Sequence, residues 1–357
     1  MKLSVLDQSP ISEGSTGAQA LRQSIELAEL CDRLGYHRYW AAEHHGGPML
    51  AGPSPEVLVG PVAAATERIR VGSGGVMLPH YSPFKVAESF SLLAGLYPER
   101  IDLGLGRASG TDPMTTHALQ RDRSKAAPDD FPQQLAELLA YLEDRLPPAH
   151  PFARLAKILP GLPERPEPWL LGSSHQSAVW AGETGLPYAF ADFINPGGSD
   201  IAELYRGRFV DSERLAAPEL AVAAWALAAE TDEEARELAS SSRMAMHELR
   251  AGRLVPVPPV EKALRYLERR GSEGAADGPA GRRPRRMILG SAATVRAGIE
   301  ELAESYGAQE VIVVTITHDP EARRRSYELI AAEMLDPPPA ASAAVAGVGG
   351  ATTTRAP

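Results

Sequence analysis

The sequence of 357 residues carries 36 basic and 46 acidic side chains, which give a formal net charge of −10 at pH 7. With 44% hydrophobic and 23% charged residues, the composition is that of a packed globular protein, not of a disordered, collagenous or membrane chain. The acidic balance argues against nucleic acids and anionic membranes as partners, because both are bound through a surplus of basic side chains.

The cysteine count and the hydropathy pattern further limit the class of protein and its cellular compartment. Cys31 is the single cysteine, so the sequence excludes an internal disulfide framework and a zinc site made of several thiolates. Residues 1–7 do not form the apolar run of a signal peptide, and no stretch of about 18 apolar residues occurs. These observations predict a cytoplasmic protein.

Short apolar segments alternate with amphipathic segments along most of the chain. Stripes at helical spacing mark residues 18–34 and 131–146 as helices. Strands are predicted at residues 3–6, 37–41, 69–78, 101–105, 169–172, 188–191, 220–227 and 311–316. Because strands and helices alternate without a break in composition, the sequence predicts one α/β domain, a (β/α)8 TIM barrel over residues 1–335.

Two segments do not fit this alternation. Residues 253–286 are rich in proline and glycine, and they predict a mobile insertion between the seventh and eighth barrel strands. Residues 336–357 contain few large apolar side chains, so burial cannot offset the entropy of ordering them. We expect this tail to be disordered.

The loops that follow the strands form the active site in such a barrel. The second predicted strand is followed by Glu43, His44 and His45. Imidazole titrates near neutral pH, so a histidine here could donate or accept a proton. Adjacent residues in an extended segment point to opposite sides, which predicts that one histidine faces the site and the other is structural.

The glycine-containing ends of the third and fourth strands each allow two interpretations, one structural and one ligand-binding. Gly74 and Gly75 in the third strand indicate either a β-bulge alone or a flat ligand that lies against bare backbone. Arg107 ends the fourth strand behind two glycines, where a guanidinium could bind a phosphate or form a surface ion pair.

The loop after the fifth strand favours an anion site. Gly172 allows close approach, and Ser173, Ser174 and Ser177 place hydroxyls at the start of the following helix, where free backbone amides attract anions. The alternative is an ordinary serine N-cap, which needs only one of these serines. Clustered metal ligands at a suitable spacing are absent from the sequence, so no metal is expected.

Taken together, these strand-end motifs resemble the bacterial-luciferase-like, flavin-dependent monooxygenases, and within them the single-chain oxidoreductases. The likeness spans residues 2 to about 335. It rests on Leu6-Asp7-Gln8-Ser9-Pro10, on Glu43-His44-His45, and on residues 71–79, 98–107, 171–174 and 313–318.

The resemblance implies roles for individual residues. His44 would lie at the flavin and support its oxygenated form, and a non-proline cis peptide bond would join Gly74 and Gly75 beneath the flavin ring. The phosphate of the cofactor would be bound by Arg107, Ser173, Ser174 and Ser177, with Gly172 beside them. Residues 253–286 correspond to the family's mobile active-site loop.

The resemblance also implies a reaction, in which reduced FMN and O2 oxidise a small organic substrate. A separate flavin reductase would supply the reduced FMN, and a homodimer is a further expectation. Light emission is not expected, because Gly106 stands where the light-emitting enzymes carry a reactive cysteine. Two alternatives stay open: a deazaflavin-dependent dehydrogenase or reductase that transfers hydride, and a flavin-binding protein without catalysis.

Overall fold

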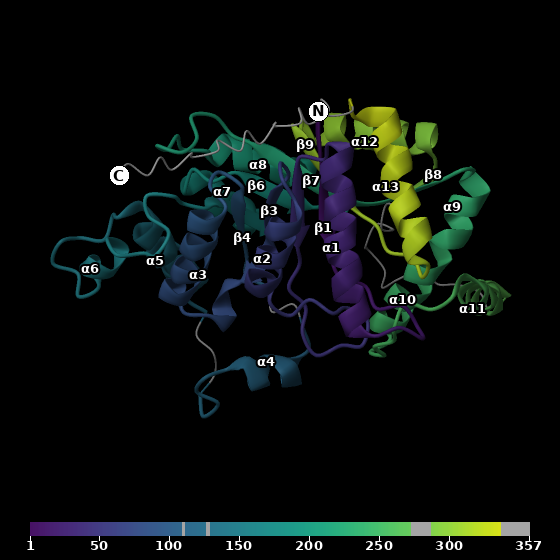
Figure 1. Ribbon diagram of the computed structural model, residues 1–357, viewed down its shortest axis with the longest axis horizontal. Coiled ribbons are helices and arrows are strands. Elements are labelled where there is room, and N and C mark those ends of the chain that lie inside the picture. The colour runs from purple at the N-terminus through teal and green to yellow at the C-terminus, as the bar shows by residue number, and fades with distance from the viewer. Residues whose placement is uncertain (109–110, 126–128, 273–286, 337–357) are drawn as a thin grey trace, which may run out of the picture.

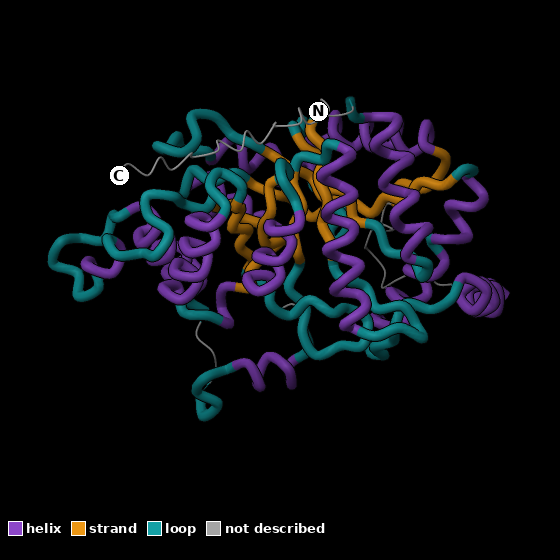
Figure 2. The backbone as a smooth tube through the Cα atoms, in the orientation of Figure 1, coloured by secondary structure: helices purple, strands orange, loops and turns teal. Residues whose placement is uncertain are grey.

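Eight parallel strands close into a barrel at the centre of the molecule (Figures 1 and 2). The computed structural model describes residues 1–108, 111–125, 129–272 and 287–336. Neighbouring strands pair in chain order, and the ring closes where the last strand pairs with both the first and the seventh. The barrel strands are β1 (Lys2–Asp7), β2 (Arg38–Ala41), β3 (Arg70–Met77), β4 (Ile101–Gly106), β5 (Glu167–Gly172), β6 (Tyr188–Ala191), β7 (Leu220–Ala229) and β9 (Glu310–Val314). The predicted TIM barrel is therefore confirmed.

A layer of helices surrounds the barrel, and shorter helices lie in its loops (Figure 2). The covering helices are α1 (Gly17–Leu34), α2 (Pro55–Ala65), α3 (Pro83–Leu96), α5 (Phe131–Glu143), α7 (His175–Glu183), α8 (Ser199–Arg208), α12 (Ala292–Tyr306) and α13 (Pro320–Met334). The additional helices are η1 (Leu78–His80), α4 (Pro113–Leu119), α6 (Ala153–Ala156), α9 (Asp232–Leu238), α10 (Ser240–Arg250) and α11 (Val260–Ser272). None of the helices in the described residues is both long and apolar enough to span a membrane.

One strand outside the barrel was not predicted. β8 (Met287–Ser291) pairs with Trp225–Ala229 of β7, while β9 pairs with Ala221–Trp225, so β7 lies between β9 and β8 in the sheet. β7 is therefore longer than the predicted residues 220–227, because its second half extends beyond the barrel to meet β8.

The segment 253–286, predicted as a mobile insertion, contains a regular element, because residues 260–272 form α11. The helix has a strongly amphipathic sequence, with Ala263 fully buried, but prolines before it and glycines after it hide this pattern. Residues 273–286 lie outside the described residues, as does the predicted disordered tail from residue 337 onward.

Side chains fill the interior of the barrel, so the space for a ligand lies at its carboxyl-terminal mouth. Trp40 and Trp169 meet edge to face inside the barrel, with ring centroids 5.4 Å apart. Toward the amino-terminal end of the barrel, the buried guanidinium of Arg38 pairs with Asp102 at 2.9 Å and with Glu310 at 3.2 Å. These contacts close the amino-terminal end, as expected for a packed barrel core.

A second buried ion pair joins β1 to α13. Asp7 accepts a hydrogen bond from Arg323 at 2.6 Å and another from the hydroxyl of Tyr39 at 2.7 Å. Burial alone would raise the pKa of Asp7, but Arg323 and the hydrogen bonds from Ser24 and Tyr39 outweigh burial and lower it. The pair ties the last covering helix to the first barrel strand.

Candidate functional site

The strands end on the lower side of the molecule in Figure 1, where α4, α10 and α11 lie around the mouth of the barrel. The predicted site residues come from the carboxyl ends of β2, β3, β4 and β5. These strands are consecutive neighbours in the barrel, so their loops lie along one side of the mouth.

The two histidines after β2 differ as the alternation predicted. His45 is the structural one, because its Nε2 lies 2.7 Å from Oε1 of the buried Glu43. Glu43 also accepts a hydrogen bond from the backbone N–H of Met77 at 2.9 Å and one from the hydroxyl of Tyr81 at 3.1 Å. No separate role was predicted for Glu43, and no signal in the sequence indicated Tyr81.

His44 has a different environment. Its Nδ1 is buried and has no hydrogen-bond partner among the described residues, while its backbone N–H donates to the carbonyl of Gly52 at 2.9 Å. Burial, and secondarily the neighbouring His45, lower the pKa of His44 to about 4. The imidazole is therefore neutral at pH 7, and its buried Nδ1 keeps an unused hydrogen-bonding capacity within the described residues.

Both alternatives for the glycines of β3 find support in the structure. The peptide bond between Gly74 and Gly75 is cis, as the resemblance implied, and the pairing with β4 shifts register between Ser73 and Val76. A Cβ at Gly74 would lie 2.5 Å from Cδ1 of Leu6 and 2.9 Å from Cβ of Trp40. Gly74 is the partly exposed residue between Val71 and Val76, so bare backbone faces the space above these side chains.

Arg107 meets the helix that carries the serines. Its guanidinium lies 5.5 Å from the ring centroid of Trp180 on α7 and 3.2 Å from Oδ2 of Asp129. The surface ion pair that we kept as an alternative is therefore formed. The contact with Trp180 places Arg107 beside α7, and a shared anion site of Arg107 with the serines stays a prediction.

The serines at the start of α7 divide into two groups. Ser174 is the N-cap, and its Oγ accepts from the backbone N–H of Ser177 at 3.3 Å, so the N-cap alternative is confirmed for this residue. The Ser177 hydroxyl is buried and lies 2.8 Å from the hydroxyl of Tyr188, whereas Ser173 and Ser174 reach the surface. A Cβ at Gly172 would lie 2.1 Å from Oγ of Ser177. We call the predicted anion site of Arg107, Ser173 and Ser174 the anion cup. Ser177 would line its wall, and a contact of Ser177 with a phosphate stays a prediction.

An apolar wall faces His44 across the mouth. β6 lies four strands from β2 in the ring of eight, which is the opposite side of the barrel. Phe193 follows β6, and its ring meets Trp225 of β7 at 5.7 Å between centroids. The apolar cluster inside the barrel continues through Trp225 to partly buried Leu50, Leu171, Phe193, Met246 and Met287. The sequence did not indicate this wall, because its members come from separate elements.

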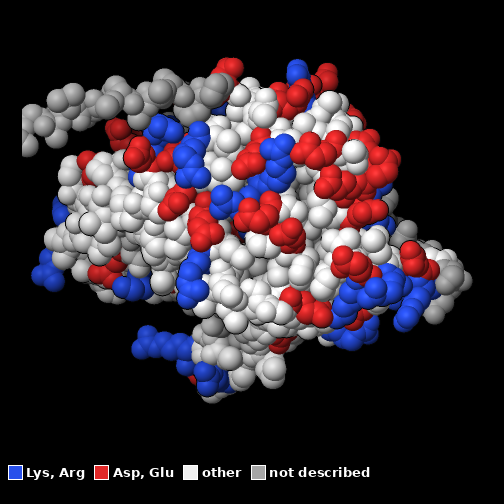
Figure 3. Space-filling model, turned by 45° about the vertical axis from the view of Figure 1, so that its right-hand side comes forward, with Lys and Arg blue, Asp and Glu red and all other residues white. Residues whose placement is uncertain are grey.

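Basic side chains flank the mouth although the chain is acidic overall. In Figure 3 they gather at the lower right, over α10 and α11, and again at the lower left, beside α4. The exposed basic residues in these regions are Arg243, Arg250, Arg253, Lys262, Arg265, Arg269 and Arg270 in the first and Arg121, Arg123 and Lys125 in the second. Within the described residues, no group of three or more His, Cys, Asp or Glu could hold a metal ion.

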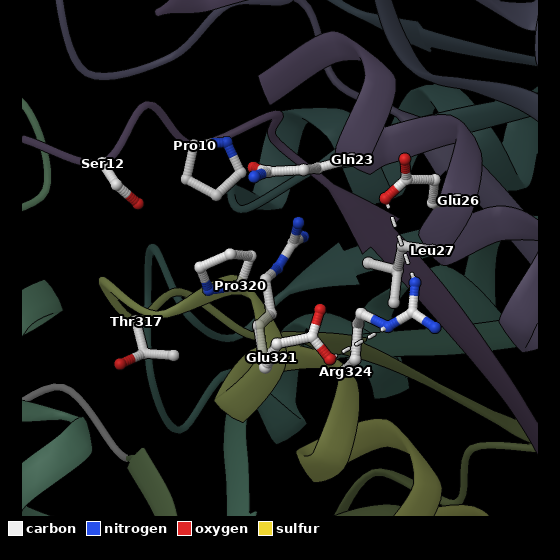
Figure 4. A pocket seen from close by; sticks show the side chains of 10 residues that line it. Pro10, Ser12, Gln23, Glu26, Leu27, Thr317, Pro320, Glu321 and Arg324 are labelled. Atoms are coloured by element: carbon white, nitrogen blue, oxygen red, sulfur yellow. Dashed lines mark ion pairs between the residues drawn. The ribbon is translucent and has the colours of Figure 1, made fainter. Parts of the chain in front are cut away.

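A small pocket on the outside of the barrel is not the cofactor site. It lies between α1 and α13 and has a volume of about 60 Å³ (Figure 4). On one side, Arg324 lies 4.0 Å from Glu26 and 3.8 Å from Glu321. This volume admits a few water molecules, and none of the predicted site residues lines it.

Comparison with known proteins supports the same reading. A family model described as luciferase-like monooxygenase matches residues 1–310. The chain is 43% identical over 343 residues to the uncharacterized protein YwcH of Bacillus subtilis, covering 94% of this chain and 100% of YwcH. It is 36% identical over 342 residues to N-acetyl-S-alkylcysteine monooxygenase of the same organism, covering 94% and 98%. The solved structure of apo-MsnO8 has 40% identity and a TM-score of 0.82, covering 93% of this chain and 97% of that one.

Solved structures below 25% identity share the fold alone. One is the oxygenating constituent of 3,6-diketocamphane monooxygenase of Pseudomonas putida in complex with FMN, with 22% identity, a TM-score of 0.68 and coverage of 93% and 97%. Another is an F420-dependent secondary alcohol dehydrogenase, with 14% identity, a TM-score of 0.59 and coverage of 93% and 98%.

Proposed function

Because the chain belongs to the luciferase-like monooxygenase family, we propose that it uses reduced FMN and O2 to oxidise a small organic substrate. The single observation that carries this proposal is the combination of bare backbone at Gly74 with the unpartnered, buried Nδ1 of His44 at the same mouth. A planar ring could lie against the backbone of Gly74. A polar atom of that ring or of a reacting group could form a hydrogen bond with Nδ1 of His44.

The described residues fit a flavin phosphate. Arg107, Ser173 and Ser174 would hold it, because a guanidinium, accessible hydroxyls and the start of a helix all favour an anion. The basic side chains around the mouth would attract the dianionic phosphate in spite of the net negative charge. When bound, reduced FMN supplies the electrons that activate O2.

His44 would act as a neutral imidazole. With its pKa lowered to about 4, it can donate or accept one hydrogen bond at Nδ1 without carrying a charge into the site. Burial keeps bulk water from its Nδ1.

The apolar wall supports an organic substrate with an apolar group. Trp225, Phe193 and Met246 offer dispersion contacts and no fixed charge, so they favour an alkyl or thioether group over a strongly polar one. The relative named for N-acetyl-S-alkylcysteine oxidation makes alkyl thioethers the first substrates to test.

We also propose two protein partners. A separate reductase would deliver reduced FMN, because the sequence contains no nicotinamide-dinucleotide fingerprint. A second copy of the chain would cover the exposed apolar side chains Val57 on α2 and Leu92 and Leu96 on α3. The cytoplasm, where reduced flavin is available, remains the predicted compartment.

Anaerobic titration of the protein with reduced FMN and, separately, with a reduced deazaflavin tests the function. Tight binding of reduced FMN, followed by O2 consumption and oxygenation of a thioether after admission of air, is the expected result. Binding of the deazaflavin alone, with hydride transfer and no use of O2, would favour the dehydrogenase alternative. Binding of FMN without any turnover would leave a flavin-binding protein.

A further inference from the structure

Glu43 is a fully buried carboxylate whose hydrogen bonds join two segments of the chain, its own loop after β2 and the stretch from Met77 to Tyr81. Its Oε1 lies 2.7 Å from Nε2 of His45 and accepts from the hydroxyl of Tyr81 at 3.1 Å. Its Oε2 accepts from the backbone N–H of Met77 at 2.9 Å. No lysine or arginine of the described residues pairs with it, so this carboxylate is stabilised by hydrogen bonds and by one imidazole.

These three donors surround the loop that carries His44. Met77 ends β3 two residues after the cis peptide bond, and Tyr81 follows η1. His45 is fixed a second time, because its backbone carbonyl accepts from the hydroxyl of Thr111, which follows β4, at 2.9 Å. His44 is therefore held on both sides by its neighbours, while its own Nδ1 has no partner in the described part of the chain.

We propose that Glu43 is a positioning residue, which locks the loop of His44 to the end of β3 so that His44 and the Gly74 backbone face one another at a fixed distance. Its effect on turnover rests on the proposed function, whereas its effect on the two histidines does not. Geometry set in this way matters, because displacing a reacting group by about 1 Å can cost roughly 100-fold in rate.

The chain offers a matched control in Glu56, at the start of α2. Burial is the main cause that raises the pKa of Glu56. The charge of Glu43 also raises this pKa and His45 lowers it, so the Glu56 carboxylate lies in the same neighbourhood. Its Oε2 is buried but has no hydrogen-bond partner among the described residues, so Glu56 does not join any segments. A change there alters charge in the cluster without removing the three bonds of Glu43.

The test compares Glu43→Gln with Glu56→Gln. An amide has one acceptor oxygen, so its NH2 group must replace one of the two oxygens of Glu43. Facing Met77 it would oppose a backbone N–H, and facing His45 it would require the imidazole to accept at Nε2 instead of donating. We expect Glu43→Gln to lower kcat for thioether oxygenation roughly 10- to 100-fold and to divert O2 to hydrogen peroxide. The Kd for reduced FMN should stay within about threefold, because the anion cup lies on other strands. Glu56→Gln should keep wild-type coupling.

A second readout needs neither cofactor nor activity. Imidazole ¹⁵N NMR of the cofactor-free protein should show His45 protonated at Nε2 in the wild type and in Glu56→Gln. In Glu43→Gln, that signature should be lost and the His44 signals should broaden or split. If Glu43→Gln does not fold, Tyr81→Phe removes one of the three bonds and should give a smaller change in the same direction.

Unchanged His44 and His45 signals in Glu43→Gln would overturn the proposal, whatever the activity. Changed signals with wild-type kcat and wild-type coupling would overturn it as well, because Glu43 would then be structural only. If the wild type itself does not turn over with reduced FMN, the proposed function fails, and the NMR comparison still decides whether Glu43 positions His44.

Discussion

Two buried carboxylates stand at the carboxyl ends of neighbouring strands and are stabilised in different ways. Asp7 at the end of β1 pairs with the buried guanidinium of Arg323 at 2.6 Å. Glu43 after β2 binds His45, a phenol and a backbone N–H. The first arrangement pairs a carboxylate with a fixed cation and joins a helix to the barrel, whereas the second holds a carboxylate by hydrogen bonds without a lysine or arginine of the described residues. The difference separates a group that stabilises the fold from a group to which we assign a role in the proposed site.

Removing the cation beside Asp7 should have the largest effect on stability. Arg323→Met leaves Asp7 buried without its counter-charge, and we expect the free energy of unfolding to fall by about 3 to 5 kcal/mol. Denaturant unfolding measures this loss. The neighbouring Arg324→Met removes only exposed ion pairs and should cost about 0 to 1 kcal/mol. Equal losses in the two variants would mean that the buried pair does not stabilise the fold.

Replacing His44 should have the opposite profile, with a large effect on turnover and a small one on folding. His44→Ala removes the neutral imidazole from the mouth, and we expect oxygenation to slow by about 10²- to 10⁴-fold. Affinity for reduced FMN should remain nearly intact, because the anion cup is unchanged. Steady-state kinetics with a binding titration check both parts, and unchanged turnover would remove His44 from the reaction.

Replacing Arg107 tests the anion cup. Arg107→Ala should weaken the binding of FMN by about 1 to 3 kcal/mol, the range for a lost charge-assisted hydrogen bond. Asp129→Asn is the matched control, because it removes the carboxylate that lies 3.2 Å from the same guanidinium and so should not weaken binding. Equal FMN affinity in wild type and Arg107→Ala would assign Arg107 to the surface ion pair alone.

The sequence predicted those features that depend on local patterns. Alternating strands and helices gave the barrel, and the alternation of an extended segment separated His44 from His45. β8 was missed because its apolar run is only three residues long before Gly290 and Ser291. The donors of Glu43 were missed because Met77 and Tyr81 are 34 and 38 residues away in the chain. The apolar wall combines Phe193, Trp225 and Met246, whose proximity follows only from closure of the barrel.

The stability of the protein should also depend on pH through His44. The folded pKa of His44 is about 4, below its unfolded value of about 6.5, so the unfolded chain binds more protons between these values. The free energy of unfolding should therefore decrease as the pH falls through this window, by up to about 1.4 kcal/mol per pH unit for each such histidine. His37, before β2, has a pKa lowered to about 4 by burial and by Arg38, so it contributes in the same window.

Chemical denaturation between pH 7 and pH 4 can separate the two histidines. His44→Gln and His37→Gln should each reduce the slope by a similar amount, because each removes one neutral imidazole that the folded state protects from protonation. Only His44→Gln should also slow turnover, since His37 lies at the opposite end of β2 from the mouth. A wild-type slope in His44→Gln would mean that the folded and unfolded chains protonate this imidazole alike, because only a difference in bound protons makes stability depend on pH. The lowering of the His44 pKa by burial, on which its neutral role rests, would then be wrong.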